Sequence, residues 1–182
     1  MYDLLALLAD GDFHSGSDLG DKLGISRAAI WKRVQRITED LGVNVQSVQG
    51  KGYRLMQPLG LLRQDILQFS FPTLPIFVYE SIGSTNDQAK QLLSSCNAPL
   101  AVLSEHQTQG KGRRGREWVS PFAQNLYLSF AWPITEGLGQ IDGLSLVVGL
   151  AVRKAIKRIS SIEAQLKWPN DILINERKEL FY

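Results

Sequence analysis

The sequence predicts an α+β chain in which a small, mostly helical domain precedes a larger mixed α/β domain. In the N-terminal third, three helix-like segments precede two short strand-like ones, whereas farther along the chain strands and helices alternate. The length of 182 residues and the 44% hydrophobic content can supply a buried core. Pro58 and Gly60 interrupt the pattern in "QPLGLL", so we expect one domain over 1–57 and another over 58–182.

The N-terminal elements follow one another at short spacing. "LLALLADG" predicts a short helix and "SGSDLGDKLG" a second one, which Ser15 or Ser17 could cap and Gly24 would end. After the tight turn "GIS", Ser26 would cap a longer helix, "RAAIWKRVQRITEDLG", whose apolar residues recur every three or four positions. "VNVQSV" and "YRLM" flank "QGKG" as two strands flank a hairpin tip. This order is that of a winged helix-turn-helix.

In the larger domain, the sequence predicts strands at "PIFVYESI", "LAVLSEHQ" and "NLYLSFAW". "STNDQAKQLLSS" predicts a helix capped by Ser84 or Thr85, and "GLSLVVGLAVRKAIKRI" a long helix with basic residues at its end. "AQLKWPNDILIN" is expected to form one strand, and "NERKELFY" a turn into another. Helices between strands indicate a layered α/β arrangement.

Charge is unevenly distributed over the N-terminal domain. Residues 1–25 carry five aspartates and one lysine, a net charge of −4; residues 26–54 carry six basic residues and two acidic ones, a net charge of +4. The helix after the tight turn enters the major groove in this motif, so its exposed side should contact DNA, and the hairpin should contact the neighbouring backbone. The candidate DNA-binding residues are Ser26, Arg27, Trp31, Lys32, Arg33, Arg36, Lys51 and Arg54. A helical interaction module with a solvated charged face is the alternative.

Composition excludes several other classes. We find no signal peptide and no apolar run long enough to span a membrane, since Arg153 and Lys154 interrupt "LSLVVGLAV". Cys96 is the single cysteine, so no internal disulfide can form, which is typical of a reducing, cytoplasmic setting. His14 and His106 lack metal-ligand spacing, so residue spacing alone predicts no metal-binding residues.

Gln107 to Ser120, "QTQGKGRRGREWVS", will be called the basic glycine loop. Its glycines allow the backbone to approach a ligand closely, and its four cations would surround an anion such as phosphate or carboxylate. It is no Walker A loop, because no Gly-Lys-Ser/Thr follows at the required spacing. A nonspecific nucleic-acid patch or a merely soluble loop remains the alternative.

Four motifs in order resemble the biotin protein ligase family: "GSTNDQA", "EHQTQGKGRRGREWVSPFAQNLYLSF", "GLSLVVGLAV" and "KWPNDILINERK". "SRAAIWKRVQ" and "GKGYRL" resemble the winged helix of its bifunctional members, which repress the biotin operon. The resemblance implies a class II synthetase-like catalytic domain of the biotin/lipoate ligase type. It also implies ATP, biotin and Mg²⁺ as substrates and cofactor, biotinyl-5'-adenylate as intermediate, and transfer to a carboxylase's biotin carrier domain. Operator DNA and a ligand-linked homodimer are the further implied partners.

The resemblance also assigns roles to residues of this sequence. For biotin it implies Ser84, Thr85, Asn86, Gln107, Lys111, Gly112, Arg113 and Lys178; for the adenylate it implies Gly110, Arg116 and Trp118. Lys178, Arg113 and Asp171 are the implied catalytic residues. Lysine at position 111 stands where the family usually has arginine, which keeps the charge but loses the planar fork. Asp171 would handle Mg²⁺ or the ammonium group, with turn capping as its alternative role.

After Lys178 the family continues into further strands and a C-terminal domain, whereas this sequence reads "ELFY" and stops. We therefore expect an incomplete catalytic domain, no C-terminal domain, and apolar side chains left exposed at a strand edge. The alternative function is a DNA-binding regulator fragment that senses biotin or a related small molecule without catalysis. Lipoate ligases share the catalytic architecture but lack such a DNA-binding domain.

Overall fold

The computed structural model describes residues 1–112, 116, 118–134, 143–167, 171–174 and 177–180. The chain divides into two compact units, one of Met1–Lys111 with Glu117–Trp132 and the other of Gly112–Arg116 with Pro133–Tyr182. The expected α+β class is confirmed, with three small sheets and six helices among the described residues.

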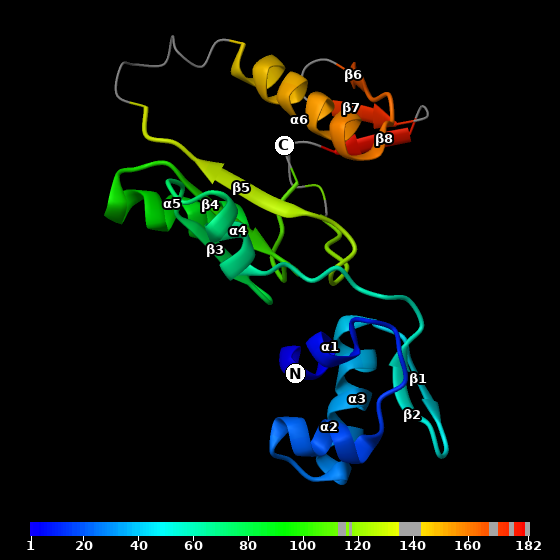
Figure 1. Ribbon diagram of the computed structural model, residues 1–182. Coiled ribbons are helices and arrows are strands. Elements are labelled where there is room, and N and C mark those ends of the chain that lie inside the picture. Colours follow the sequence, from blue (N-terminus) through cyan, green and yellow to red (C-terminus); the bar gives the residue numbers. More distant parts are fainter. Residues whose placement is uncertain (113–115, 117, 135–142, 168–170, 175–176, 181–182) are drawn as a thin grey trace. The chain divides into compact units, whose positions relative to one another are not determined.

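The N-terminal elements are α1 (Tyr2–Leu8), α2 (Gly16–Leu23), α3 (Arg27–Leu41), β1 (Val45–Val48) and β2 (Gly52–Leu55) (Figure 1). Ser15 caps α2 by accepting a hydrogen bond from the Asp18 amide at 3.0 Å, which decides between the two expected caps. Ser26 caps α3 by accepting from the Ala29 amide at 3.2 Å, as expected. The winged helix-turn-helix order is confirmed.

The three N-terminal helices bury their apolar stripes against one another. From α3 come Ile30, Val34 and Ile37, each 3% exposed or less. The other members of this buried cluster are Leu4, Leu5, Leu8, Leu19, Tyr53, Leu55 and Phe122. Burying this much apolar surface is the main stabilising contribution to the region. It leaves the polar side of α3 outside the core.

The hairpin of β1 and β2 is held against the segment before α2. His14 and Tyr53 exchange two backbone hydrogen bonds of 2.9 Å, so residue 14 pairs with β2 as an additional bridge. A Cβ at Gly52 would lie 2.0 Å from the His14 carbonyl oxygen, and Gly52 has φ +101°. Glycine is therefore required there for close approach as well as for backbone conformation, which the sequence-based assignment to a hairpin tip did not reveal.

The second sheet has the order β3 (Ile76–Tyr79), β4 (Leu100–Ser104), β5 (Tyr127–Ala131). β3 and β4 pair in parallel through a crossover that contains α5 (Thr85–Cys96), and β4 and β5 pair antiparallel. Leu100 and Val102 pack on the α5 side, whereas Ala101 and Leu103 pack on the other side. β4 is thus buried on both faces, as the central strand of a layered structure should be.

A further helix, α4 (Gln64–Ser70), was not predicted from the sequence. Its glutamines bind the edge of the sheet: the side-chain carbonyls of Gln64 and Gln68 accept hydrogen bonds of 3.0 Å from the amides of Val78 and Ile76. Leu67 packs against the apolar cluster of Ile76. The helix is short and is specified by these tertiary contacts rather than by strong periodicity.

β5 places its large apolar side chains outward. Within the described residues, Phe130 is 66% exposed and Trp132 is 70% exposed, whereas Tyr127 and Ala131 face inward. Leu126 and Leu128 are also exposed. Large apolar side chains are therefore exposed on β5 and on the residues directly before and after it.

The second unit contains α6 (Leu144–Ser160), β6 (Gln165–Lys167), β7 (Asp171–Ile174) and β8 (Arg177–Leu180). The prediction of one strand over "AQLKWPNDILIN" is wrong, because β6 and β7 are separate strands that pair antiparallel. The strand-like composition on both sides of a reversal explains the error. β8 pairs antiparallel with β7, as the expected turn into a further strand requires. No helix among the described residues is long and apolar enough to cross a membrane.

Candidate functional sites

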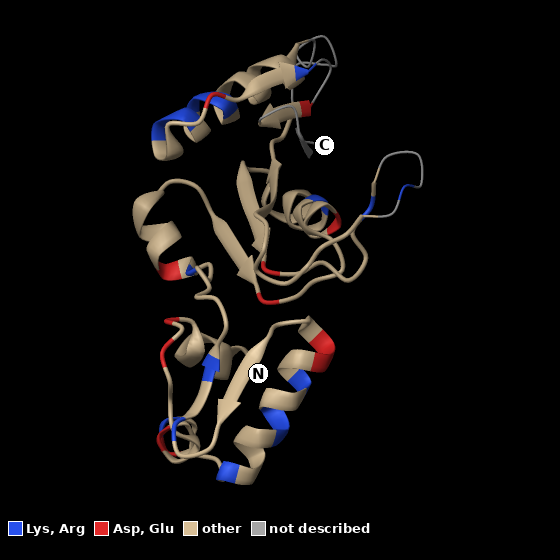
Figure 2. Cartoon of the chain, turned by 90° about the vertical axis from the view of Figure 1, so that its right-hand side faces the viewer, with Lys and Arg blue, Asp and Glu red and all other residues tan. Residues whose placement is uncertain are grey.

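The exposed side of α3 is basic. Each residue of an α-helix is rotated by about 100° from the one before, which places Lys32 and Arg36 opposite the buried stripe of Ile30, Val34 and Ile37. Figure 2 shows basic residues along α3 and acidic residues at its C-terminal end. Within the described part of the chain, neither Lys32 nor Arg36 has an acidic partner at ion-pair distance.

The other candidate DNA-binding residues of α3 lie on its flanks. Trp31 is 53% exposed and so stands outside the core. Arg33 is half-buried, and the stem of Arg27 packs on α2, where a Cβ at Gly16 would lie 3.2 Å from its Cγ. Part of the side chain of Arg27 therefore serves helix packing, although the residue as a whole is exposed.

The two cations of the wing share one aromatic ring. The Arg54 guanidinium lies 4.6 Å and the Lys51 ammonium 5.7 Å from the centroid of Phe13. Arg54 also donates a 2.7 Å hydrogen bond from Nε to the Gln46 side chain. These contacts fix both cations on the wing, and neither the sequence spacing nor the charge pattern had indicated a role for Phe13.

Thr85 and Gln107, far apart in the sequence, meet at the start of α5. Gln107 Oε1 accepts hydrogen bonds from the Thr85 amide at 2.8 Å and from the Thr85 hydroxyl at 3.1 Å. The same hydroxyl lies 2.9 Å from the Ser129 hydroxyl on β5. Sequence reasoning missed Ser129, although a serine that alternates with the large apolar residues Leu128 and Phe130 in a strand is a usable signal.

Backbone pairing holds these two segments side by side. Thr108 and Gln109 donate 2.8 Å hydrogen bonds to the carbonyls of Ile82 and Gly83, and Ile82 donates to His106 at 3.1 Å. Ser84 is buried and caps α5, with its hydroxyl 3.4 Å from the Asp87 amide, whereas Asn86 is exposed. Of the three residues of the Ser-Thr-Asn motif, the structure thus brings Thr85 into direct contact with Gln107.

Lys111 begins the positive part of the loop and is paired with an unexpected partner. Its ammonium lies 2.6 Å from the Asp87 carboxylate on the first turn of α5. The hydrogen bond from Lys111 lowers the pKa of Asp87 below its usual value. Both side chains are more than half exposed, so the pair is screened by solvent and contributes little to stability.

Two glycines of the loop are explained by close packing. A Cβ at Gly110 would lie 2.3 Å from the Trp118 ring, so the indole packs directly on this part of the backbone. At Gly112 a Cβ would lie 2.7 Å from the Arg116 carbonyl oxygen, which accepts the Gly112 amide at 3.1 Å. Neither glycine needs positive φ; close approach is what excludes a side chain there.

The remaining candidates belong to other regions. Arg113 lies outside the described residues. In the second unit, Asp171 begins β7 opposite Lys167, and Lys178 pairs with Leu173 through the backbone register of β8. The side-chain roles expected for Arg113, Asp171 and Lys178 stay predictions.

Comparison with known proteins agrees with the order of these regions. The model of the Biotin/lipoate A/B protein ligase family matches residues 78–178, and that of an HTH domain matches residues 1–54. Bifunctional ligase/repressor BirA of Salmonella typhimurium is 42% identical over 175 residues, which are 96% of this chain and 54% of the relative. The biotin--[acetyl-CoA-carboxylase] ligase of Mycobacterium tuberculosis is 34% identical over 128 residues, 66% of this chain and 48% of the relative.

The chain spans about half the length of the curated relatives it matches. Among solved structures, biotin protein ligase from Leishmania major in complex with biotinyl-5-AMP is 32% identical, with a TM-score of 0.50 over 57% of this chain and 49% of that one. The family model covers more than half of the sequence, including the Thr85–Gln107 contact and the basic glycine loop. The chain therefore belongs to the biotin/lipoate A/B protein ligase family.

Proposed function

We propose that the protein activates biotin with ATP to biotinyl-5'-adenylate and then transfers biotin to a lysine of a carboxylase's biotin carrier domain, in the cytoplasm. The observation that carries this proposal is the cluster of Thr85, Ser129 and Gln107, the first residue of the basic glycine loop, in which Thr85 bonds to both of the others. The names of the curated relatives, and a related structure that holds biotinyl-5-AMP, support it.

The Gln107 contact supports recognition of a ureido ring. A backbone N–H can only donate, so the side-chain atom that faces the Thr85 amide must be the Gln107 oxygen. The Gln107 NH₂ group is thereby turned away from Thr85 and can donate to the biotin ureido carbonyl. Ser84, Thr85 and Asn86 supply acceptors for the ureido N–H groups in this proposal.

Activation requires positioning more than proton transfer. The biotin carboxylate is already ionised at neutral pH, and its oxygen attacks the α-phosphorus of ATP while the bond to pyrophosphate breaks. Bringing the two anions together is unfavourable, so fixed cations and backbone N–H groups should contribute most of the rate. We assign this to Lys111, Gly112, Arg113 and Lys178 around the reacting groups. Gly110, Arg116 and Trp118 are assigned to the adenylate.

The second step is aminolysis of the adenylate. The neutral amine of the carrier lysine attacks the acyl carbon, AMP leaves, and the amine loses a proton. Mg²⁺ would arrive with ATP, since no group of three or more candidate metal ligands occurs among the described residues and Mg²⁺ is commonly held by phosphates plus one or two carboxylates. Asp171 is the carboxylate we assign to Mg²⁺ or to the ammonium group.

The basic side of α3 and the wing carry a second proposed function. We infer that the candidate residues of α3 and the wing bind operator DNA, and that the adenylate-bound form acts as a homodimeric repressor. Lys32 and Arg36 lie opposite the core and have no acidic partner among the described residues, which supports phosphate contact. Two winged helices on one dimer would read a two-fold-symmetric operator. Sedimentation with and without biotin and Mg-ATP tests the dimer; an unchanged monomer contradicts it.

Adenylate formation is the decisive test. The purified chain is incubated with biotin and Mg-ATP, and biotinyl-5'-adenylate is sought by mass spectrometry. Gln107→Leu should reduce biotin affinity by about tenfold or more, because ureido groups would lose a paired partner. Gln109→Leu, the same change two residues along on an exposed side chain, is the matched control.

Three results would argue against the proposal. Folded protein that binds operator DNA but forms no adenylate would favour a regulator that senses its ligand without catalysis. Binding of lipoate in preference to biotin would favour a lipoate ligase. An equal loss of affinity in Gln107→Leu and Gln109→Leu would remove the specific role of Gln107.

A further inference from the structure

Glu105 is a buried carboxylate that the proposed chemistry does not use. It lies at the end of β4, two residues before Gln107, and is 2% exposed. Its Oε1 accepts a hydrogen bond from the Leu62 amide at 2.5 Å. Leu62 belongs to the segment that leads from the winged helix to the second sheet. Burying a carboxylate costs free energy unless it is hydrogen-bonded, so a buried glutamate at position 105 requires a structural explanation.

The backbone of Glu105 fixes the other end of the basic glycine loop. Its carbonyl accepts a 2.9 Å hydrogen bond from the Ala123 amide, and its own amide donates to Tyr79 on β3 at 3.1 Å. The loop therefore starts just after Glu105 and returns to it just after Ser120. Glu105 therefore adjoins the segments on both sides of the loop, along the chain before Gln107 and through the Ala123 amide after Ser120.

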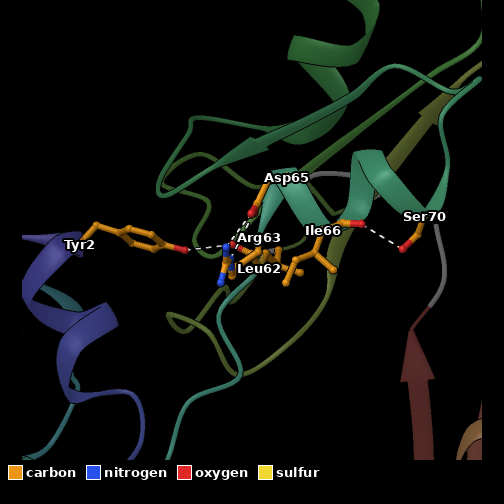
Figure 3. Close-up of polar contacts among 6 residues, drawn as sticks. All are labelled: Tyr2, Leu62, Arg63, Asp65, Ile66 and Ser70. Carbon is orange, nitrogen blue, oxygen red and sulfur yellow. Dashed lines mark hydrogen bonds and ion pairs between the residues drawn. The ribbon is translucent and has the colours of Figure 1, made fainter.

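Two contacts connect the winged helix with the segments that bind Glu105. Figure 3 shows the Tyr2 hydroxyl of α1 donating to the Leu62 carbonyl, at 3.1 Å. Phe122, next to Ala123, is 1% exposed and belongs to the apolar cluster of the three N-terminal helices. Leu61 packs against that same cluster, whereas Leu62 packs against the cluster of Ile76 in the second sheet.

Charge interactions agree with this geometry. Burial raises the pKa of Glu105, and hydrogen bonds from the Leu62 amide and the Tyr2 hydroxyl oppose the shift. Burial, then the negative charge of Glu105, raises the pKa of Tyr2. Glu105 therefore affects the pKa of Tyr2, and Tyr2 affects the pKa of Glu105, beside the segment that joins the winged helix to the second sheet.

We propose that Glu105 is a positioning residue that couples the basic glycine loop to the winged helix, its backbone holding the loop at Ala123 and its carboxylate holding the linker at Leu62. Binding of an adenylate in the loop would then alter the packing of α1 and the linker, and by linkage the state of the winged helix would alter ligand affinity. The coupling rests on the proposed function. The hydrogen-bonded link between Glu105 and Leu62 does not depend on the proposed function.

Hydrogen exchange followed by mass spectrometry on the full chain tests both the link between Glu105 and Leu62 and its coupling to ligand binding. Wild type, Glu105→Ala, Glu105→Gln and Tyr2→Phe are compared, with Glu80→Gln as control because it neutralises an exposed carboxylate near the same tyrosine. Without ligand, Glu105→Ala should raise exchange at the Leu62 amide by about ten- to a hundredfold, the amount expected for a lost hydrogen bond to a charged group. Glu105→Gln keeps an acceptor and should restore protection. Amides of α3 should be unchanged in all variants.

The ligand arm uses biotin and Mg-ATP, with biotin binding followed by calorimetry. Wild type should change its exchange in α1 and at Leu62 on binding. Glu105→Ala should bind biotin and lose that change, Tyr2→Phe should lose part of it, and Glu105→Gln and Glu80→Gln should keep it. If Glu105 only stabilises the fold, Glu105→Ala should instead raise hydrogen exchange throughout the chain.

The outcomes separate the two proposals. Ligand-induced change in Glu105→Ala equal to that of wild type overturns the coupling, and so does a wild type that binds biotin with no change in α1. If the Leu62 amide exchanges at the same rate in wild type and in every variant, the hydrogen-bonded link between Glu105 and Leu62 is overturned. If Glu105→Ala does not fold, Tyr2→Phe, which removes one hydroxyl, decides the matter. A wild type that neither binds biotin nor makes adenylate defeats the proposed function and the coupling, while the ligand-free arm still decides the link.

Discussion

Two helices of this protein, α3 and α6, are similar in length and both combine apolar and basic residues, yet they differ in what surrounds them. Three residues of α3 are buried within the winged helix, and its exposed cations have no acidic partner among the described residues. No residue of α6 is fully buried in the described part of the chain, and two of its basic residues, Arg153 and Lys157, form ion pairs with Glu163. Sequence composition alone does not separate a helix that presents charge to a partner from one that presents apolar surface.

The largest effect should come from matched valine truncations in these helices. Val34 is 3% exposed in α3 and Val147 is 63% exposed in α6. Val34→Ala should lower the free energy of unfolding by about 2 kcal/mol through lost burial and a residual cavity, and Val147→Ala by about 0.5 kcal/mol or less. Urea unfolding measures both. Equal losses would show that α6 is buried in solution and would break the comparison.

Removing basic side chains should separate the two helices by function. Lys32→Ala should lower affinity for a labelled duplex by about tenfold at low salt and reduce the slope of log affinity against log salt by about one, as expected for one lost phosphate contact. Lys157→Ala, on α6 beside Glu163, should leave both quantities unchanged. Fluorescence anisotropy over a salt series measures them, and identical slopes in both variants would remove α3 from the DNA-binding surface.

Glu105 should give the stability of the protein an unusual pH dependence. Its pKa is raised by burial, so the folded state takes up a proton at a pH where the unfolded state does not yet bind it. Acidification from about pH 7 toward about pH 4.5 should therefore stabilise wild type relative to Glu105→Gln, and the gain should level off below the unfolded pKa. Unfolding free energies of both proteins across this range test the sign. A constant difference would mean that the carboxyl is not desolvated.

The smallest effect is expected at the exposed pair of Asp87 and Lys111. Asp87→Asn frees the ammonium of Lys111 for an anionic ligand, so affinity for biotinyl-adenylate should rise by about twofold at low salt and return to the wild-type value at high salt. Thermal unfolding should be unchanged. Calorimetry at two salt concentrations measures the affinity; a large, salt-independent gain would show that the pair is shielded from solvent.

Much of the fold could be predicted because local signals were strong. The cap at Ser26 and the helix end at Gly42 follow from side-chain hydrogen bonding and left-handed backbone at defined positions, whereas for α5 the sequence left Ser84 and Thr85 open and the structure selects Ser84. The helix α4 was missed and the strands β6 and β7 were merged, since neither carries enough local pattern. Tertiary contact, through Gln64 and Gln68 in the case of α4, supplies what the local sequence lacks.

The candidate sites divide in the same way. The basic glycine loop, the Ser-Thr-Asn motif and the cations of α3 were evident from residue type and spacing, so the sequence by itself determined the family and the groups available for chemistry. Only the tertiary structure decided that Thr85 meets Gln107 and Ser129, that Lys111 pairs with Asp87, and that Glu105 joins the loop to the linker. The physical reason is that these contacts join residues some 20 to 45 positions apart, whose approach depends on how the sheet and helices pack and not on any local propensity.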